Sequence, residues 1–548
     1  GNQQQGQVWQ NVLTPPHTHS LTYMARDLAT KLDDLGLSQR QPGQPQKQVH
    51  EFVTTWYDDA LSFSIVLGRL FRVIFTPPIP FTMSDKTFSI RTYGCQMNVR
   101  DSEVLSNRLI AHGYVPIEDE NLAHIIIVNS CSVRGKAEDK ALGKVQLLCS
   151  ERDERPGLIV GLMGCMAQRL GEGIFKKVPG LSFTVGTRAE KLIPGILARL
   201  ESGEDHICET GVHDDVEDDC GCGTPEEPAP TPAPTTVKPV TSLVTILLGC
   251  NRRCSYCIVP DVRGEEHSRM PAEILLEIRE LAAAGVRDIT LLGQSVMNYG
   301  KRNFTWPAEI PSAQGFSEPL PRLFELIAAT IPEITRLRFT SGHPSGVTPE
   351  LIRAMRDIPQ VCPHLHLPMQ SGSDRILKAM RRGYDSAQYL EAVTRLREAI
   401  PDIALTTDII VGFPGETEQD FEDTRRVMQL AGFDNAFIFK YSPRPGTPSA
   451  SMLDDVSEEE KMRRNQVLLD DQDKRGVAQN QAWIGRDTDV LAEGPSLRNA
   501  TRWSGRSPQN KIVVFDLSRP VNVGDTVRVH ITHAHPQTLF GDLTVASL

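Results

Sequence analysis

Ten short apolar runs, each followed by a polar or helix-like stretch, constrain the fold of this 548-residue chain more than any other feature. Four of them lie between residues 85 and 200, namely TFSIRTY, AHIIIVNS, GLIVGLMG and LSFTVG. Six more begin at residue 241, in VTILLGC, DITLLGQS, RLRFTSGHP, HLHLPMQSGS, ALTTDIIVGFPGE and NAFIFKYSPRPG. Strands that alternate with helices pair in parallel, so both regions are predicted to be α/β.

The two groups predict different α/β architectures. Residues 85–200 are expected to form a Rossmann-like domain, with a parallel sheet covered by helices. The six repeats over 241–475 are expected to form a partial (β/α)6 barrel, whose functional groups follow the carboxyl ends of its strands. An open doubly wound sheet is the alternative for this second region. After residue 480 the pattern changes to short β runs with turns, which predicts a small C-terminal β-barrel over 480–548.

The remaining segments have compositions that do not predict a core. Residues 201–240 hold eleven acidic residues and one lysine, followed by the proline-rich run TPEEPAPTPAPTTVKP. We expect a connector there, and its charge of about −10 accounts for nearly all of the net charge of −11. The segment that precedes Met83 is rich in Gln and Pro. Residues 1–84 are therefore expected to be a disordered extension. A mitochondrial transit peptide is the alternative, against which the acidic residues of this segment count.

The stretch GCNRRCSYC places Cys250, Cys254 and Cys257 directly after an expected barrel strand. Thiol-only sites suit iron–sulfur clusters or zinc, both of which take four ligands. No fourth cysteine follows at a compatible spacing, and His267 stands ten residues further on. The spacing favours an iron–sulfur site with one open position, with zinc as the alternative. We call these three residues the barrel triad.

A second set of cysteines is dispersed along the first α/β region. Cys95, Cys131 and Cys165 lie 36 and 34 residues apart, and each follows an expected parallel strand. Because parallel strands end along one edge of a sheet, the three loops can converge on a second open cluster. Single buried cysteines without a ligand role are the alternative. We call this set the N-terminal triad; Cys149, Cys208, Cys220, Cys222 and Cys362 fit neither pattern.

The motifs around both triads resemble one enzyme family. YGCQMNVRDSE, NSCSVRGKAEDK, GLMGCMAQR, HLPMQSGSDRILKAMRRGY and TDIIVGFPGETEQDF are similar to motifs of the radical S-adenosylmethionine (SAM) methylthiotransferases. The resemblance covers roughly residues 85–548 without the acidic connector. It is strongest to the branch that modifies dimethylallyladenosine in tRNA. Ser130, Asp261 and the long connector depart from the family pattern, and none of them is a cluster cysteine.

The resemblance implies two 4Fe-4S clusters, an auxiliary one on the N-terminal triad and a radical-generating one on the barrel triad. SAM would occupy the open iron of the barrel cluster. Two SAM molecules and both clusters would then serve methylthiolation of carbon 2 of N(6)-dimethylallyladenosine at tRNA position 37. Polar and small residues at the expected strand ends, with the aromatic residue inside the cysteine motif, are the SAM-contacting candidates: Tyr256, Gly293, Gln294, Ser341, Gln370, Ser371 and Asp408.

The C-terminal region resembles the TRAM module, a small RNA-binding β-barrel. Its net charge is only about +1, but basic residues gather around one tryptophan in the expected loop RNATRWSGRSPQNK. Phosphate contact and base stacking need such a combination. The RNA-binding candidates are Arg498, Arg502, Trp503, Arg506 and Lys511. A solvated basic loop is the alternative.

The resemblance also implies partners. A tRNA anticodon loop would be the substrate, and an electron donor such as flavodoxin or ferredoxin would reduce the cluster. We expect a cytoplasmic monomer without a membrane segment, because no apolar run is long enough to span a bilayer. Methylthiolation of threonylcarbamoyladenosine or of a ribosomal protein is an alternative activity. A zinc-binding RNA adaptor, with both triads structural, is an alternative from another class.

Overall fold

The computed structural model describes residues 86–544, apart from residues 134, 212–239, 303, 309 and 311. The expected extension over 1–84 and most of the expected connector, with Cys220 and Cys222, therefore lie outside the described residues. None of the helices in the described part of the chain is long and apolar enough to cross a membrane.

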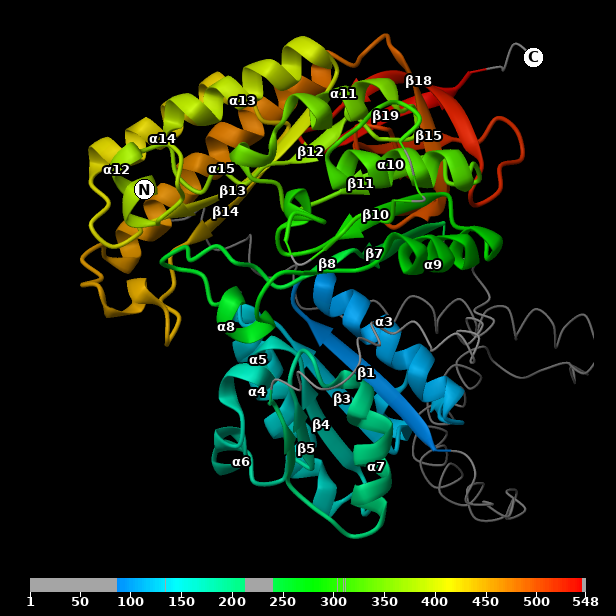
Figure 1. The fold of residues 1–548 in the computed structure, drawn as a ribbon, viewed down its shortest axis with the longest axis vertical. Helices are drawn as coiled ribbons and strands as arrows, with labels where there is room; N and C mark the ends of the chain where they lie inside the picture. The colour runs from blue at the N-terminus through cyan, green and yellow to red at the C-terminus, as the bar shows by residue number, and fades with distance from the viewer. Residues whose placement is uncertain are drawn as a thin grey trace, which may run out of the picture. The chain divides into compact units, whose positions relative to one another are not determined.

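The N-terminal domain is a six-stranded sheet in the order β2-β1-β3-β4-β5-β6, and every strand pair in it is parallel (Figure 1). Its strands are β1 (Thr87–Tyr93), β2 (Val115–Pro116), β3 (Ile125–Ser130), β4 (Ile159–Met163), β5 (Phe183–Val185) and β6 (Ile207–Glu209). Its helices are α3 (Gln96–Ala111), α4 (Gly135–Ser150), α5 (Cys165–Leu170), α6 (Gly173–Lys177) and α7 (Ile193–Glu201). The prediction of a parallel-sheet α/β domain is confirmed.

Alternate residues of the buried strand β3 face opposite helix layers. Ile125 and Ile127 pack with side chains of α3 and α7, whereas Ile126 and Val128 pack with side chains of α4, α5 and α6. A strand buried on both faces is continuously apolar, which is why the sequence IIIV marks it clearly. The result is a three-layer domain whose central strands carry the N-terminal triad at their carboxyl ends.

The edge strand β6 lies inside the range that was expected to be connector. Ile207–Glu209 pairs in parallel with β5, so the expected boundary at residue 200 comes too early. Three residues between acidic neighbours give no periodic apolar pattern, and the composition of the surrounding segment masks them.

The second region contains the six expected parallel strands in chain order. They form two three-stranded sheets, β7-β10-β11 and β12-β13-β14. A parallel bridge between Leu337 and Val361 joins the two sheets, so the six strands follow one another as in a partial barrel. The strands are β7 (Thr241–Thr245), β10 (Asp288–Leu292), β11 (Arg336–Phe339), β12 (His364–His366), β13 (Ala404–Val411) and β14 (Asn435–Lys440).

Helices cover the outside of these strands. They are α9 (Pro271–Ala283), α10 (Pro319–Thr330), α11 (Pro349–Asp357), α12 (Asp374–Ala379), α13 (Ser386–Ala399), α14 (Glu418–Ala431) and α15 (Glu458–Gln481), whereas α8 (Val259–Arg263) lies beside α5 of the N-terminal domain. Three of them begin with proline at the first helical position, where the missing N–H costs nothing. α14 begins at a Thr417 cap and ends at Gly432, which adopts the left-handed conformation.

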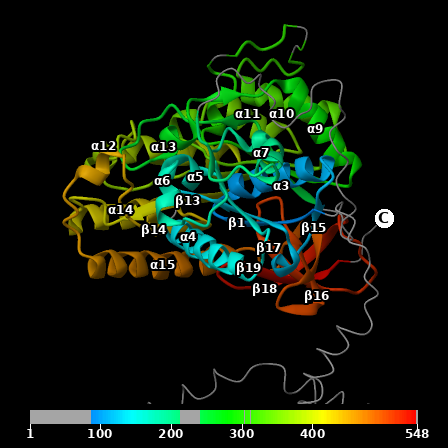
Figure 2. The same ribbon diagram turned by 90° about the horizontal axis from the view of Figure 1, so that it is seen from below.

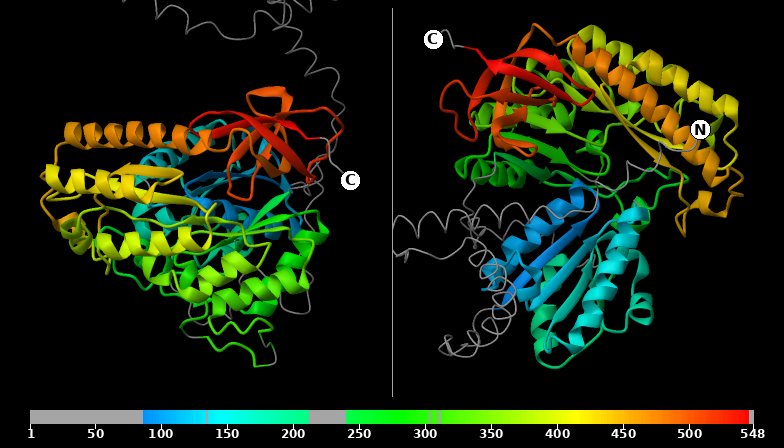
Figure 3. Two further views of the ribbon diagram at one scale, coloured as in Figure 1. Left: turned by 90° about the horizontal axis from the view of Figure 1, so that it is seen from above. Right: turned by 180° about the vertical axis from the view of Figure 1, so that it is seen from behind.

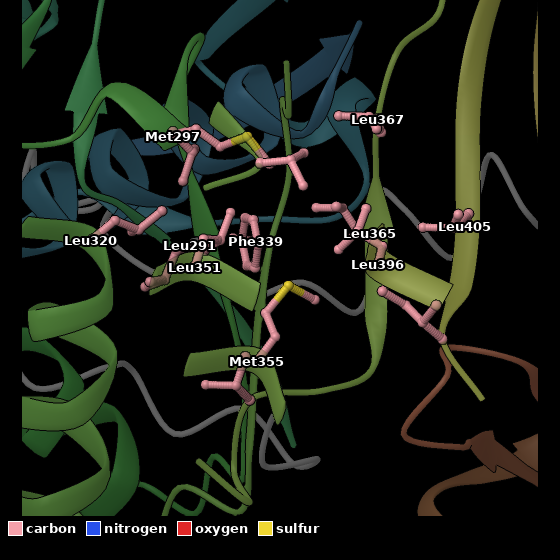
Figure 4. Close-up of a cluster of buried hydrophobic side chains, with 14 of the residues drawn as sticks. Leu291, Met297, Leu320, Phe339, Leu351, Met355, Leu365, Leu367, Leu396 and Leu405 are labelled. Carbon is pink, nitrogen blue, oxygen red and sulfur yellow. The ribbon is translucent and has the colours of Figure 1, made fainter. Parts of the chain in front are cut away.

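Strands and helices of this region share one apolar core. Figure 4 shows Leu291, Phe339, Leu365 and Leu405 from successive strands beside side chains of the covering helices. Each of these four strand residues is buried to 1% exposure or less. Full burial of such a side chain contributes roughly 2 kcal/mol, so this core holds the strand ends in fixed positions.

The C-terminal domain is a closed five-stranded barrel in the order β15-β16-β17-β19-β18. Its strands are β15 (Asp487–Ser496), β16 (Asn499–Arg506), β17 (Ile512–Asp516), β18 (Thr526–Ala534) and β19 (Thr538–Leu543). The long helix α15 lies beside β14 and reaches this barrel, as Figures 2 and 3 show. Asn465 of α15 donates to the Ile438 carbonyl, and Asn480 donates to the His535 carbonyl. α15 thus crosses the expected end of the second domain at residue 475.

The expected loop RNATRWSGRSPQNK is mostly strand, which corrects the sequence-based interpretation. Asn499–Arg506 is β16 and pairs with both β15 and β17. The sequence does not indicate this strand, because its charged residues face solvent in a small barrel and it contains no continuous apolar run.

Candidate active site

The barrel triad lies on a loop that three other segments hold in place. The Cys250 N–H donates to the Gly264 carbonyl at 3.1 Å, and the Ser255 N–H donates to the Met380 carbonyl at 3.0 Å. The Ser449 N–H donates to the Ser255 carbonyl at 2.8 Å. Gly249 precedes the triad at φ +77°, and a Cβ there would lie 1.9 Å from the Glu265 carbonyl oxygen. The loop therefore requires glycine at this position.

A buried arginine faces the middle cysteine of the barrel triad. Arg382 is 8% exposed, and its Nη1 donates to the Cys254 sulfur at 3.3 Å and to the Tyr256 hydroxyl at 3.4 Å. Burial raises the pKa of the Cys257 thiol to about 12 and also raises the pKa of Cys250. The free thiols of Cys250 and Cys257 are therefore protonated at neutral pH, and metal binding must release their protons.

The predicted SAM-contacting residues of the first strands lie beside this loop. The Gly249 N–H donates to Gln294 Oε1 at 2.5 Å, while Gln294 Nε2 is buried without a hydrogen-bond partner among the described residues. A Cβ at Gly293 would lie 2.8 Å from the Leu247 carbonyl oxygen. Tyr256 packs against the apolar cluster of Ile376, Met380, Phe413 and Tyr441. The unpartnered amide nitrogen leaves a donor available to a ligand.

The predicted residues of the later strands are brought together only in part. Ser341 and Gln370 have φ angles of +59° and +70°, a strained conformation for residues other than glycine. The Gln370 N–H donates to the Asp408 carbonyl at 2.8 Å, and the Asp408 carboxylate lies 3.4 Å from His366 Nε2. Ser371 differs, because its buried hydroxyl accepts from the Ser373 N–H at 3.2 Å and lies 3.3 Å from the Thr424 hydroxyl. Its bonds support the start of α12.

The N-terminal triad converges at the carboxyl edge of adjacent strands. Cys95 caps α3 after β1, Cys131 follows β3, and Cys165 begins α5 after β4. The thiols of Cys95 and Cys165 interact with the thiol of Cys131, which lowers the pKa of Cys95 and of Cys165 and raises the pKa of Cys131. The lowered pKa values favour the thiolate forms of Cys95 and Cys165, and the thiolate is the form that binds metal.

The surroundings of the N-terminal triad also fit a bound polar group. The hydroxyls of Ser130 and Ser132, on either side of Cys131, are buried without hydrogen-bond partners among the described residues. A cluster with inorganic sulfides accepts such hydrogen bonds. No three His, Cys, Asp or Glu side chains in this described part of the chain surround the position of a single ion. The thiol-only donor set fits a cluster.

The short segment from Cys257 to Arg263 connects the two triads. Val262 of α8 and Ile258, which directly precedes this helix, pack against Cys165. Arg263 is 4% exposed and forms an ion pair with Asp101 of α3 at 2.6 Å. Its charge also helps to lower the pKa of both Cys165 and Cys95. Arg263 and Arg382 carry no signal in the sequence, because a single arginine without a spacing pattern does not indicate a site.

The predicted RNA-binding residues are not equally available. The Lys511 side chain is 9% exposed and bonds Asp434 at 2.8 Å and Asn480 at 2.9 Å, so it joins the barrel domain to the C-terminal domain. Arg502 pairs with Asp516 at 2.9 Å, and Arg506 lies 3.5 Å from Glu493. Trp503 packs partly buried on the C-terminal core, whereas Arg498 is exposed. Lys511 has a structural role.

Comparison with family models assigns all three described domains. Residues 244–428 match the radical SAM superfamily, residues 87–186 match the Uncharacterized protein family UPF0004, and residues 481–544 match the TRAM domain. The radical SAM match brings SAM and a 4Fe-4S cluster as cofactors. Among solved structures, the chain is similar to the radical S-adenosylmethionine methyltransferase TsrM from Kitasatospora setae. That similarity has a TM-score of 0.49 and 14% identity, over 67% of this chain and 74% of the other.

Curated relatives match nearly their whole length. The tRNA-2-methylthio-N(6)-dimethylallyladenosine synthase of Methylacidiphilum infernorum is 42% identical over 84% of this chain and 95% of the relative. The protein of the same name from Akkermansia muciniphila is 43% identical over 82% of this chain and 97% of the relative. The chain therefore belongs to the radical-SAM methylthiotransferases, in the family of the tRNA-2-methylthio-N(6)-dimethylallyladenosine synthases.

Proposed function

We propose that this protein methylthiolates carbon 2 of N(6)-dimethylallyladenosine at position 37 of tRNA. The observation that carries the proposal is the presence of two thiol triads, each one ligand short of four, joined through α8. The relatives named above carry this activity in their names. Their similarity extends across both triads, so the proposal covers the whole site.

Each triad would hold one 4Fe-4S cluster. Cys250, Cys254 and Cys257 would bind three irons of the barrel cluster, and Cys95, Cys131 and Cys165 would bind three irons of the other. With SAM bound, such clusters supply a carbon-centred radical and a methylated sulfur for transfer. Two SAM molecules would be consumed for each modified adenosine.

The chain's own residues orient and protect this chemistry. Arg382 fixes the Cys254 sulfur and the Tyr256 hydroxyl from one buried guanidinium. The amide of Gln294 and the carboxylate of Asp408 are the polar groups that we propose for SAM, together with Gly293, Ser341 and Gln370. Apolar packing of Tyr256 limits water beside the barrel triad. Ser371 and Lys511 leave the proposed ligand sets, because their polar groups are buried as well as bonded within the protein.

The partners follow from the substrate. The TRAM domain supports RNA as the substrate class, and we propose that Arg498, Arg502, Trp503 and Arg506 contribute to holding the anticodon loop. An acidic one-electron donor of the flavodoxin or ferredoxin class would reduce the barrel cluster. We propose a cytoplasmic monomer, since tRNA is modified there.

Mass spectrometry of tRNA nucleosides tests the proposal. A strain lacking the gene should accumulate dimethylallyladenosine and lose its 2-methylthio derivative, and the wild-type gene should restore it. A Cys254→Ala copy should fail to restore it. An unchanged methylthio-dimethylallyladenosine level would refute the proposal. Loss of the methylthio group from threonylcarbamoyladenosine or from a ribosomal protein would assign the alternative substrates.

A further inference from the structure

A polar pocket beside the barrel triad has no role in the chemistry described so far. A hollow of about 590 Å³ is lined by Asn251, Arg253, Glu265 and Arg302. An adjoining hollow of about 230 Å³ shares two of these residues and is lined by Asn251, Arg252, Glu266, Asn298, Lys301 and Arg302. Asn251 directly follows the cluster ligand Cys250, so the pocket borders the reactive centre.

One buried carboxylate oxygen in this pocket lacks a partner. Glu266 is only 4% exposed. Its Oε1 accepts from Asn298 Nδ2 at 2.9 Å and from the Asn251 N–H at 3.3 Å. Its Oε2 is buried without a hydrogen-bond partner among the described residues. A buried carboxylate oxygen in this state costs free energy unless a ligand supplies a donor.

The same pocket carries a surplus of positive charge. Its charged lining consists of two glutamates and four basic side chains, Arg252, Arg253, Lys301 and Arg302. Lys301 and Arg302 are exposed, whereas Arg252 Nε is buried without a partner in the described chain. A fitting ligand therefore presents both an anion and a hydrogen-bond donor.

We propose that this pocket binds a nucleotide of the RNA next to the target adenosine. The inference rests on the proposed function and names a second RNA contact site for it. The phosphate would lie against Lys301 and Arg302, and a ribose hydroxyl or a base amine would donate to Glu266 Oε2. An acidic protein surface fits less well, because it would bring further carboxylates toward Glu266.

The test is the affinity of the cluster-loaded full chain for an anticodon stem–loop RNA that carries dimethylallyladenosine, measured by fluorescence anisotropy. Lys301→Ala/Arg302→Ala should weaken binding on the order of tenfold and reduce the slope of log affinity against log salt by about 1 or more. The affinity for SAM should stay unchanged. The control is Lys176→Ala/Lys177→Ala, which removes the same charge from an exposed pair on α6 and should bind like wild type.

The Glu266→Gln variant shows whether a ribose hydroxyl or a base amine of the RNA donates to Glu266 Oε2. If a ribose hydroxyl bonds Oε2, this variant weakens binding of the RNA but not of a stem–loop with 2′-deoxy sugars beside the target. If a base amine does so, both ligands bind more weakly. The inference is overturned if the Lys301/Arg302 variant binds RNA like its control, or loses SAM affinity or reduction by the electron donor instead. Wild-type protein that binds no stem–loop RNA would overturn the proposed function as well.

Discussion

The barrel triad occupies a stretch of eight residues, whereas the cysteines of the N-terminal triad lie 36 and 34 residues apart. The barrel triad depends on one loop, which is fixed by Gly249 and by backbone hydrogen bonds. The N-terminal triad depends on sheet topology, because β1, β3 and β4 are neighbours and end at one edge. A substitution in the cysteine loop should therefore damage the barrel triad. A substitution that disturbs the packing of the domains should damage the N-terminal triad.

The largest effect is expected from the ligands themselves. Alanine at any one of the six triad cysteines should abolish the methylthio-adenosine product, because each cluster needs its three thiolates. Nucleoside mass spectrometry of tRNA incubated with each variant measures this. The control is Cys149→Ala, at a thiol whose pKa is raised to about 11 by burial and which lies in neither triad. Full activity of Cys95→Ala would remove the N-terminal triad from the site.

Gly249→Ala should affect the barrel triad alone. A Cβ in this left-handed position meets the Glu265 carbonyl, so the loop must shift by more than the cluster tolerates. We expect loss of about half of the bound iron, with the signal of the N-terminal cluster retained in electron paramagnetic resonance spectra.

The matched substitution for this prediction is Gly143→Ala in α4. A Cβ there has no described neighbour within 4 Å, and alanine favours the helix by about 0.5–1 kcal/mol. Iron content should be unchanged. If Gly249→Ala also keeps all of its iron, the barrel triad does not depend on this loop conformation.

Arg263→Gln should affect the N-terminal triad instead. It removes the buried cation that pairs with Asp101 and lies close to Cys95 and Cys165. We expect a loss of about 3 kcal/mol in denaturant-induced unfolding and an altered spectrum of the N-terminal cluster only. Arg356→Gln, at an exposed Arg–Asp pair, should leave the free energy of unfolding nearly unchanged. Equal effects of the two variants would contradict the role of Arg263 between the domains.

A smaller, pH-dependent effect is expected beside the barrel triad. Burial, with Arg382 and Arg252 nearby, lowers the pKa of His343 to about 3. An unfolded histidine takes up its proton near pH 6.5, so stability is complete above that pH and falls as pH drops from 6.5 toward 3. At pH 5.5 the loss from His343 should be about 1 kcal/mol.

Comparing unfolding at pH 7.5 and 5.5 tests this effect. His343→Gln should reduce the difference between the two pH values, whereas His112→Gln, at an exposed histidine, should not. An unchanged pH dependence in His343→Gln would show that this histidine is not held neutral by the fold.

The sequence predicts the strands and both triads because their signals are strong and local. Buried parallel strands such as IIIV are continuously apolar, and a cysteine directly after such a strand marks the sheet edge. The strand β6 and the strand β16 are missed, since the first is three residues long and the second is charged on its outer face. Arg263, Arg382 and Glu266 could not be found either. Their roles depend on which distant backbone or carboxylate lies opposite, and no spacing rule encodes that.

The iron and sulfide content of anaerobically purified protein tests the two-cluster account most directly. Wild-type protein should carry about eight irons and eight sulfides per chain, and the variant with alanine at Cys95, Cys131 and Cys165 should carry about four of each. A wild-type content of about four irons, or a variant that keeps about eight, would contradict the assignment of a cluster to the N-terminal triad.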